Sequence, residues 1–221
     1  MTLVIAASGR NFMVVGADSR ATIRDASGNR IEINTVKKII PVAKHVVVLI
    51  YGEADESIYL AKRFKFLNKK IDGVSNVAEK YAEFCRKEMQ KIANVPRLPE
   101  YFPMFGFIVA GLDTARKGRV YNVPRSYTLK SHNGFLLGRP DPVAHGGKPF
   151  IALYQYNQKY DEEMTKDQLT QYVAQCIYDT MAVDGDVGGR IRITVIDSEG
   201  MFDRPYQNIR KGIEQWGQPL I

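Results

Sequence analysis

Hydrophobic positions open the chain in short runs that predict buried strands before any helix. Two runs, at residues 3–7 and 12–17, flank a polar turn and predict a hairpin. Two further runs, at 38–42 and 46–50, predict a second strand pair. A hydrophobic sheet that precedes the first helix favours an α+β protein over a repeating βαβ order.

The segment 23–34, between these strand pairs, is polar. It contains the turn formers Asp25, Gly28 and Asn29, so we expect a turn region there.

The apolar spacing becomes helical after residue 55. Leu60, Ala61, Phe64 and Leu67 fall on one face of a predicted helix. A second helix is expected after Ser75. Its inward positions are Val77, Tyr81, Phe84, Cys85 and Ile92. Strands are then expected at 105–111 and 119–123, around a turn at 113–118.

A third well-marked helix is expected after Thr165, which forms a capping box with Gln168. Its buried stripe is Leu169, Tyr172, Val173, Cys176 and Ile177. A loop at 184–189 follows, and the last clear strand is 191–196. No linker or repeat divides the chain, so we expect residues 1–221 to form a single domain.

Composition is ordinary for a soluble globular protein of 221 residues, with 45% hydrophobic and 25% charged residues. The sequence has no long apolar run and no secretory signal pattern, so we expect a cytoplasmic protein without a membrane partner. Cys85 and Cys176 fall on apolar helix faces, where buried free thiols are expected rather than a disulfide.

The net charge of +7 raises the question of a nucleic-acid partner. The basic residues are scattered, however, apart from a cluster at 62–70 that fits the solvated face and end of a helix. No nucleic-acid motif accompanies them, so we expect no such partner.

The N-terminus offers candidate chemistry. Thr2 follows Met1, and methionine aminopeptidase generally removes Met before a small second residue. Removal of Met1 would give Thr2 a free α-amine, so that one residue carries both a hydroxyl nucleophile and its own base.

Three segments in order carry a family resemblance: Thr2-Leu3-Val4-Ile5-Ala6-Ala7, then Gly16-Ala17-Asp18-Ser19-Arg20-Ala21-Thr22, then Thr35-Val36-Lys37-Lys38-Ile39. This series strongly resembles the β-type subunits of the proteasome and their bacterial relatives, the peptidase of the two-component ATP-dependent protease. A turn at 111–115 adds to the resemblance, which extends from residue 2 to about 196. It implies the N-terminal nucleophile hydrolase fold, a four-layer αββα sandwich of two stacked antiparallel sheets flanked by helices.

The resemblance also implies residue roles. Thr2 would be the nucleophile, and Lys38 would face it and disfavour protonation of the α-amine. Asp18 would pair with Lys38, and Arg20 would brace the adjoining turn. Because strand side chains alternate in direction, only one of Lys37 and Lys38 can share the site face, and the family pattern selects Lys38.

A backbone N–H near Gly52 is the candidate oxyanion donor. The family usually has two glycines before an Ala-Asp pair, whereas this chain has Tyr51-Gly52-Glu53-Ala54-Asp55. Gly52 is therefore either the oxyanion position or an ordinary turn residue.

The chain departs from the family at two accessory serines. The segment 144–149 has no serine, and the matching position falls on Gly146 or His145. His145 would act there as a donor or proton carrier, or it is a structural residue of the turn. In the loop at 184–189, Asp184 matches the family aspartate but Val187 replaces the serine. Asp186 either compensates for the missing serine hydroxyls or serves as a turn or ion-binding residue.

We therefore expect a threonine-type peptidase that acts on peptides or unfolded proteins without a metal or cofactor. The resemblance implies a ring-forming homo-oligomer and an ATP-dependent unfoldase or regulatory ring as partner. Two alternatives stay open: a catalytically inactive homologue, and one that transfers the acyl group to an amine and so ligates peptides.

Overall fold

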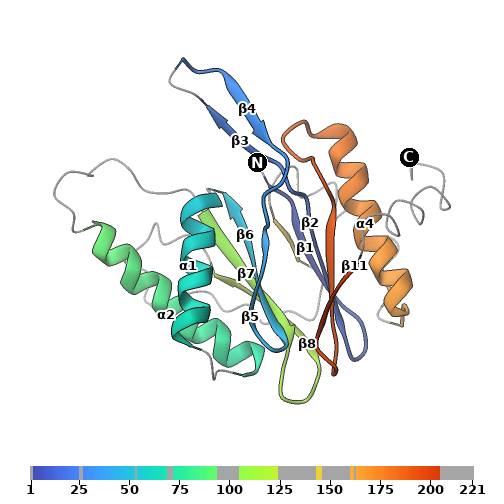
Figure 1. The fold of residues 1–221 in the computed structure, drawn as a ribbon. Helices are drawn as coiled ribbons and strands as arrows, with labels where there is room; N and C mark the ends of the chain where they lie inside the picture. The colour runs from blue at the N-terminus through green and yellow to red at the C-terminus, as the bar shows by residue number, and fades with distance from the viewer. Residues whose placement is uncertain are drawn as a thin grey trace.

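Two antiparallel sheets form the centre of the protein (Figure 1). The structure is a computed structural model, and it describes residues 2–24, 27–52, 54–68, 72–93, 105–123, 143–145, 160–161 and 163–204. The first sheet has the order β11-β10-β2-β1-β9, and the second has the order β5-β6-β7-β8. The described part is thus α+β, as the sequence predicts.

The first sheet contains the predicted N-terminal hairpin and the predicted late strand. Its strands are β1 Val4–Ser8, β2 Met13–Ala17, β9 Val143–His145, β10 Arg192–Ile196 and β11 Met201–Arg204. β9 and β11 were not predicted from the sequence. Both are short strands at the sheet edges, β9 paired with β1 and β11 paired with β10. Pairing with a neighbour, rather than a long apolar run, defines them.

The four strands of the second sheet were all predicted. They are β5 Ile39–Ala43, β6 Val46–Gly52, β7 Phe105–Leu112 and β8 Gly118–Val123. β6 and β7 pair in continuous register from Val46↔Gly111 to Gly52↔Phe105. β5 is an edge strand, and its register with β6 shifts between Pro41 and Ala43.

The two sheets pack face to face through apolar side chains. β1 shows how: Val4 and Ala6 belong to the cluster between the sheets, whereas Ile5 and Ala7 belong to the cluster under helix α4. Because both faces of this strand are covered, all its residues are buried and apolar alternation is absent.

Helix α4, Lys166–Val183, covers the outer face of the first sheet (Figure 1). The predicted capping box is confirmed, because Gln168 N–H donates to Thr165 Oγ1 and Thr165 N–H donates to Gln168 Oε1. The predicted stripe is buried throughout. A Cβ on Gly16 would lie 2.5 Å from Cγ1 of Val173, so this glycine allows the helix to pack closely on β2.

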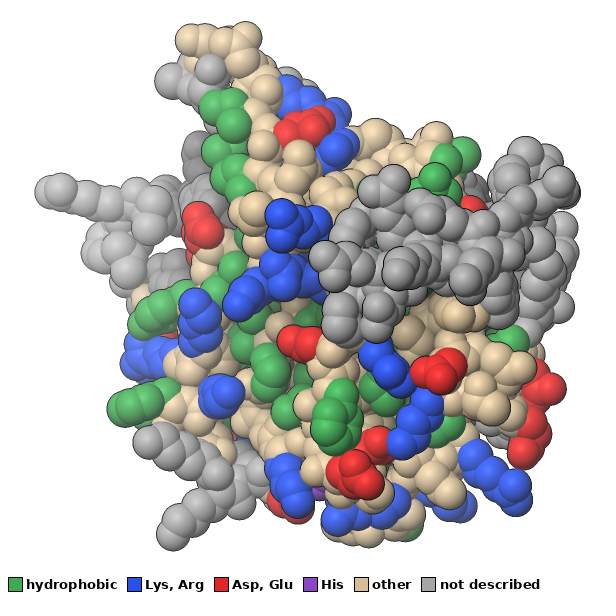
Figure 2. Space-filling view, turned by 45° about the vertical axis from the view of Figure 1, so that its right-hand side comes forward, with side chains coloured by type: hydrophobic (Ala, Val, Ile, Leu, Met, Phe, Trp, Pro, Cys, Tyr) green, Lys and Arg blue, Asp and Glu red, His purple; other side chains and the backbone are tan. Residues whose placement is uncertain are grey.

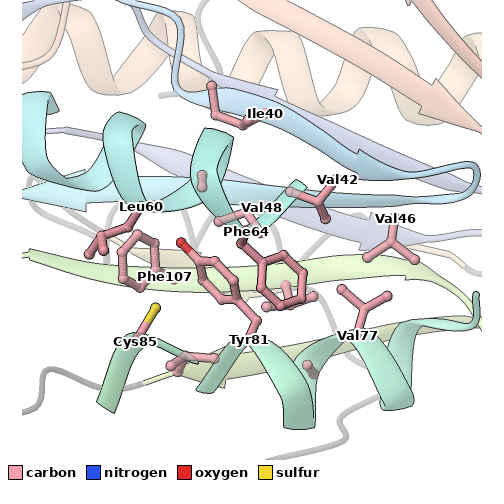
Figure 3. Close-up of a cluster of buried hydrophobic side chains, with 14 of the residues drawn as sticks. Ile40, Val42, Val46, Val48, Leu60, Phe64, Val77, Tyr81, Cys85 and Phe107 are labelled. Atoms are coloured by element: carbon pink, nitrogen blue, oxygen red, sulfur yellow. The ribbon is translucent and has the colours of Figure 1, made fainter. Parts of the chain in front are cut away.

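Helices α1, Ala54–Leu67, and α2, Val74–Ala93, cover the outer face of the second sheet (Figure 1). Their core is aromatic: the Tyr81 ring makes edge contacts with Phe64 at 4.9 Å and Phe107 at 5.0 Å between centroids (Figure 3). Of the four residues predicted on one face of α1, Leu60, Ala61 and Phe64 are buried, whereas Leu67, the last residue of the helix, is 58% exposed.

A two-stranded ribbon, β3 Ala21–Arg24 and β4 Arg30–Ile33, projects from the body (Figure 1). From the sequence, only a turn region was expected at 23–34. The register places Ile23 opposite Ile31 and Ala21 opposite Ile33, so four apolar side chains share one face. This short cross-strand pattern stabilises strands within a segment whose overall composition is polar.

Both cysteines are buried free thiols, as predicted. Burial raises the pKa of Cys85 and of Cys176 to about 12. Within the described ranges, no helix is long and apolar enough to cross a membrane.

Candidate active site

Asp18 and Lys38 form a buried ion pair where the two sheets meet. Asp18 directly follows β2 of the first sheet, and Lys38 directly precedes β5 of the second. Lys38 Nζ lies 2.7 Å from Asp18 Oδ1 and 2.5 Å from the carbonyl oxygen of Arg20. The side chains are 0% and 2% exposed, so solvent screens the pair little.

The Asp18 carboxylate also fixes the N-terminal segment. Its Oδ1 accepts a hydrogen bond from Leu3 N–H at 2.9 Å, and Asp18 N–H donates to the Leu3 carbonyl at 3.2 Å. The residue after Thr2 is therefore bound to the same oxygen that holds Lys38 Nζ. Thr2 itself is buried, with 6% of its surface exposed.

The second carboxylate oxygen of Asp18 is also occupied. Oδ2 accepts hydrogen bonds from Arg20 N–H at 3.1 Å and Gly188 N–H at 3.0 Å. Two backbone donors, together with Leu3 N–H and the Lys38 ammonium, satisfy this buried carboxylate.

Burial lowers the pKa of Lys38 below its usual value. The charge of Asp18 and its hydrogen bond oppose this shift, while the positive charge of Arg20 adds to it. Burial outweighs the attraction of the partner carboxylate. Lys38 thus combines a fixed position with an ammonium group that releases its proton more readily than a solvated lysine.

Arg20 joins three segments. Its Nη1 donates to the Gly185 carbonyl at 2.8 Å, its Nε donates to Asn34 Oδ1 at 3.0 Å, and Nη2 lies 3.3 Å from Glu32 Oε2. The side chain connects the β3–β4 ribbon to the loop at 184–189. This geometry suits the expected bracing of the adjoining turn.

The loop at 184–189 differs from the family pattern in a specific way. Val187, at the position where the family resemblance implies a serine, is 1% exposed and belongs to the apolar cluster under α4. Asp184 Oδ1 accepts from Asp186 N–H at 3.0 Å, whereas its Oδ2 is buried without a hydrogen-bond partner. Asp186 pairs with Arg30 of β4 at 3.0 Å, so its carboxylate is engaged with the ribbon.

For the remaining predicted residues, the structure describes the backbone of Gly52 and of His145. Gly52 ends β6 with φ of +89°, a left-handed conformation that favours glycine and by itself accounts for the residue. The backbone of His145 pairs with Val4 of β1, two residues after Thr2. Gly146 lies outside the described residues.

Sequence reasoning missed Ser19 as an organising residue. Its hydroxyl donates to the Asn34 carbonyl at 2.7 Å and accepts from Arg190 N–H at 2.6 Å. The one sequence signal for Ser19 was its place between Asp18 and Arg20. A single serine matches no motif, so this signal did not identify its role.

These features define a class: an α+β protein whose buried Asp–Lys pair anchors the N-terminal segment beside a threonine. The family model "Proteasome subunit" matches residues 2–196. The chain is 26% identical over 210 residues to "Proteasome subunit beta type-6" of Dictyostelium discoideum, covering 90% of this chain and 86% of that protein.

Two other relatives agree. The Arabidopsis thaliana protein "Proteasome subunit beta type-6" is 26% identical over 225 residues, covering 99% of this chain and 86% of that protein. "Proteasome subunit beta" of Streptomyces griseus is 26% identical over 218 residues, covering 90% of this chain and 70% of that protein. The chain belongs to the proteasome subunit family, as a divergent member of its β type.

Proposed function

We propose that this protein hydrolyses peptide bonds with Thr2 as an N-terminal nucleophile, after removal of Met1. One observation carries the proposal: the Asp18 oxygen that binds Lys38 Nζ also binds the backbone of Leu3. This arrangement favours a threonine held beside a fixed cation, which is the requirement for keeping its α-amine unprotonated.

In the proposed first half-reaction, the α-amine of Thr2 takes the hydroxyl proton, directly or through a water. Oγ then attacks the peptide carbonyl carbon, and a backbone N–H near Gly52 stabilises the oxyanion. When the tetrahedral intermediate collapses, the C–N bond breaks and the leaving amine takes the proton. The product is an ester of the acyl group on Thr2.

In the second half-reaction, the α-amine takes a proton from water, whose oxygen attacks the ester carbonyl. Collapse releases the carboxylic acid and returns the proton to Oγ. In both steps, Lys38 provides a positive charge near the amine, and Asp18 holds Lys38 in position. We assign Arg20, His145, Gly146 and Asp184 to positioning the loops around this site.

We further propose that residues 1–221 form one domain with the four-layer αββα arrangement, and that copies assemble into a ring. The relatives' names describe subunits, which supports an assembly of several chains. The substrates of this ring would be peptides or unfolded proteins, delivered in the cytoplasm by an ATP-dependent unfoldase or a regulatory ring.

A second candidate function is a subunit without catalytic activity. The observation that favours it is Val187, which is part of the apolar core where the family has a serine. Loss of one positioned hydrogen bond costs on the order of 10²- to 10³-fold in rate, so catalysis would be slowed rather than necessarily abolished.

An intact-mass measurement after treatment with a peptide epoxyketone tests the two candidates. This reagent needs a hydroxyl and an adjacent free amine. We expect a mass that lacks Met1 and carries one adduct. Thr2→Ala is the matched control, because it keeps the N-terminal amine and removes the hydroxyl, and it should carry no adduct.

Two outcomes contradict the catalytic proposal. An adduct on Thr2→Ala would show that another residue reacts. Protein isolated from its native cell that retains Met1 and stays unmodified would favour the non-catalytic subunit.

A further inference from the structure

A cleft with a basic lining lies between β5, the edge strand of the second sheet, and the β10–β11 hairpin of the first. It has a volume of about 320 Å³, at the lower end of the range for small-molecule sites. β5 of the second sheet contributes Ile39 and Pro41, and the β10–β11 hairpin of the first sheet contributes the opposite wall. On the face shown in Figure 2, Lys and Arg side chains gather below the projecting ribbon.

The lining is unbalanced in charge. Lys37, Arg190, Arg192 and Arg204 line the cleft against one acidic residue, Asp203. Oδ1 of Asp203 accepts a hydrogen bond from Thr194 Oγ1 at 2.6 Å. Arg204 pairs with Asp167 of α4 at 2.9 Å. Among the residues that the structure describes, no carboxylate lies within ion-pair distance of the Lys37, Arg190 or Arg192 side chains.

Arg192 has a polar atom with no partner in the described part of the protein. Its Nε is buried and has no hydrogen-bond partner, and the same holds for Nε of Arg204. A buried donor without a partner is costly, and a guanidinium offers paired donors that match a carboxylate or phosphate. Arg192 is the first residue of β10, a strand paired on both sides, so its backbone is held in place.

The edge of β5 limits the kind of ligand. Pro41 has no backbone N–H, and the β5 register shifts between Pro41 and Ala43. Such an edge is poorly suited to pairing with an added peptide strand. A ligand would therefore be bound by side chains, with oxyanion groups near the basic residues and an apolar part against Ile39.

We propose that this cleft binds a small organic anion carrying carboxylate or phosphate groups. The site differs from the candidate active site. Lys37 is exposed and lines the cleft, whereas its neighbour Lys38 is buried and binds Asp18. The cleft is nevertheless close in space to that site, because Arg190 N–H donates a hydrogen bond to Oγ of Ser19, the residue next to Asp18.

Isothermal titration calorimetry with citrate and with pyrophosphate tests the proposal on the full-length protein. We expect at least one probe to bind with a Kd below about 1 mM at 0.15 M salt. Arg192→Gln should weaken that binding by about tenfold or more, because it removes a charge-assisted donor. Arg86→Gln is the matched control, since Arg86 is exposed on α2 and the charge change is the same.

Lys37→Gln provides a second test that does not depend on the buried arginine, because Lys37 is exposed and its loss leaves the core intact. It should weaken the same probe while the melting temperature stays unchanged. Citrate binding alone would identify a polycarboxylate site, and pyrophosphate binding alone would identify a phosphate site. The proposal is overturned if neither probe binds, or if Arg86→Gln weakens binding as much as Arg192→Gln and Lys37→Gln do.

Discussion

Gly188 N–H donates a hydrogen bond to Oδ2 of Asp18 at 3.0 Å, across 170 positions of sequence. The Gly188 carbonyl in turn accepts from Ser19 N–H at 3.0 Å. A Cβ at position 188 would lie 2.5 Å from Cζ of Arg20, so the lack of a side chain lets this loop close on the Asp18 segment. The loop at 184–189 and the buried carboxylate therefore hold each other in place.

Gly188→Ala should disturb this contact. The added methyl group must displace the Arg20 guanidinium or move the loop away from Asp18, at a cost of about 1–3 kcal/mol in the free energy of unfolding. Urea unfolding measures the loss, and the epoxyketone reaction should slow as well. Gly185→Ala is the control in the same loop, because no atom lies within 4 Å of its added Cβ. Equal effects of the two substitutions would contradict the close-contact explanation.

Lys38→Ala should abolish the epoxyketone reaction and destabilise the protein. It leaves the Asp18 carboxylate buried without its cation, and breaking a buried pair in this way costs about 3–5 kcal/mol. Lys37→Ala, one residue away with an exposed side chain, should leave both properties close to those of the wild-type protein. Reaction and unfolding measurements on both variants separate the two lysines. An active Lys38→Ala variant would remove this residue from the proposed mechanism.

Several parts of this structure were predictable because local patterns determine them. The capping box at Thr165 and the apolar period of α4 predicted that helix, and continuous apolar runs predicted β1, β2 and β6. The edge strands β9 and β11 were not predicted, because pairing with a distant partner defines them. The β3–β4 ribbon was missed because its apolar face has only short alternation.

The candidate site also has parts that were predictable from the sequence and parts that were not. The family resemblance predicted that Asp18 would pair with Lys38, and the two are in contact. The Gly188 hydrogen bond and the role of Ser19 were not predictable, because a backbone donor carries no side-chain signal. That Val187 joins the core depends on which way the loop turns, and sequence spacing alone does not determine this.

Val187→Ser should reduce stability, although it introduces the serine that the family resemblance implies at this position. A buried valine side chain would be exchanged for a smaller polar one in the cluster under α4, which costs about 1–3 kcal/mol. The control is Val183→Ser, because Val183 is 54% exposed at the end of the same helix and should change little. Thermal unfolding of both variants checks this expectation. If Val187→Ser is as stable as the wild type, the placement of the Val187 side chain in the apolar core is wrong.

His45 should make stability depend on pH. Its side chain is 2% exposed, both ring nitrogens lack hydrogen-bond partners, and burial, with Arg116 and Lys44, lowers its pKa. Asp72 and a backbone contact at Asp197 act in the opposite direction but do not outweigh this. Because the unfolded chain binds a proton more readily, stability should fall as the pH drops below about 6.5.

His45→Gln removes this titration and leaves the other two histidines unchanged. Urea unfolding from pH 7.5 to 5.5 should therefore show a steeper loss of stability in the wild-type protein than in the variant. Parallel pH profiles would mean that His45 is protonated equally in the folded and unfolded states.

The projecting ribbon offers a test of assembly. Ile23, Ile31 and Ile33 lie on one face of it and are 48%, 43% and 41% exposed, an unusual exposure for three isoleucines in one patch. The opposite face contacts the body, because Glu32 pairs with Arg20 and Arg30 contacts Gly185 and Asp186 of the loop at 184–189. If copies of the chain form a ring, a second copy should cover the isoleucine face.

Ile31→Glu should therefore shift native mass spectra from oligomer to monomer, because it places a charge in the centre of a contact that would exclude water. Its folded state should survive, since the side chain is outside the core clusters and the monomer's melting temperature should stay close to that of the wild type. Thr35→Glu adds the same charge at an exposed position just beyond β4 and should leave the oligomer intact. An oligomer that tolerates Ile31→Glu as well as it tolerates Thr35→Glu would show that the ribbon face is not the contact between copies.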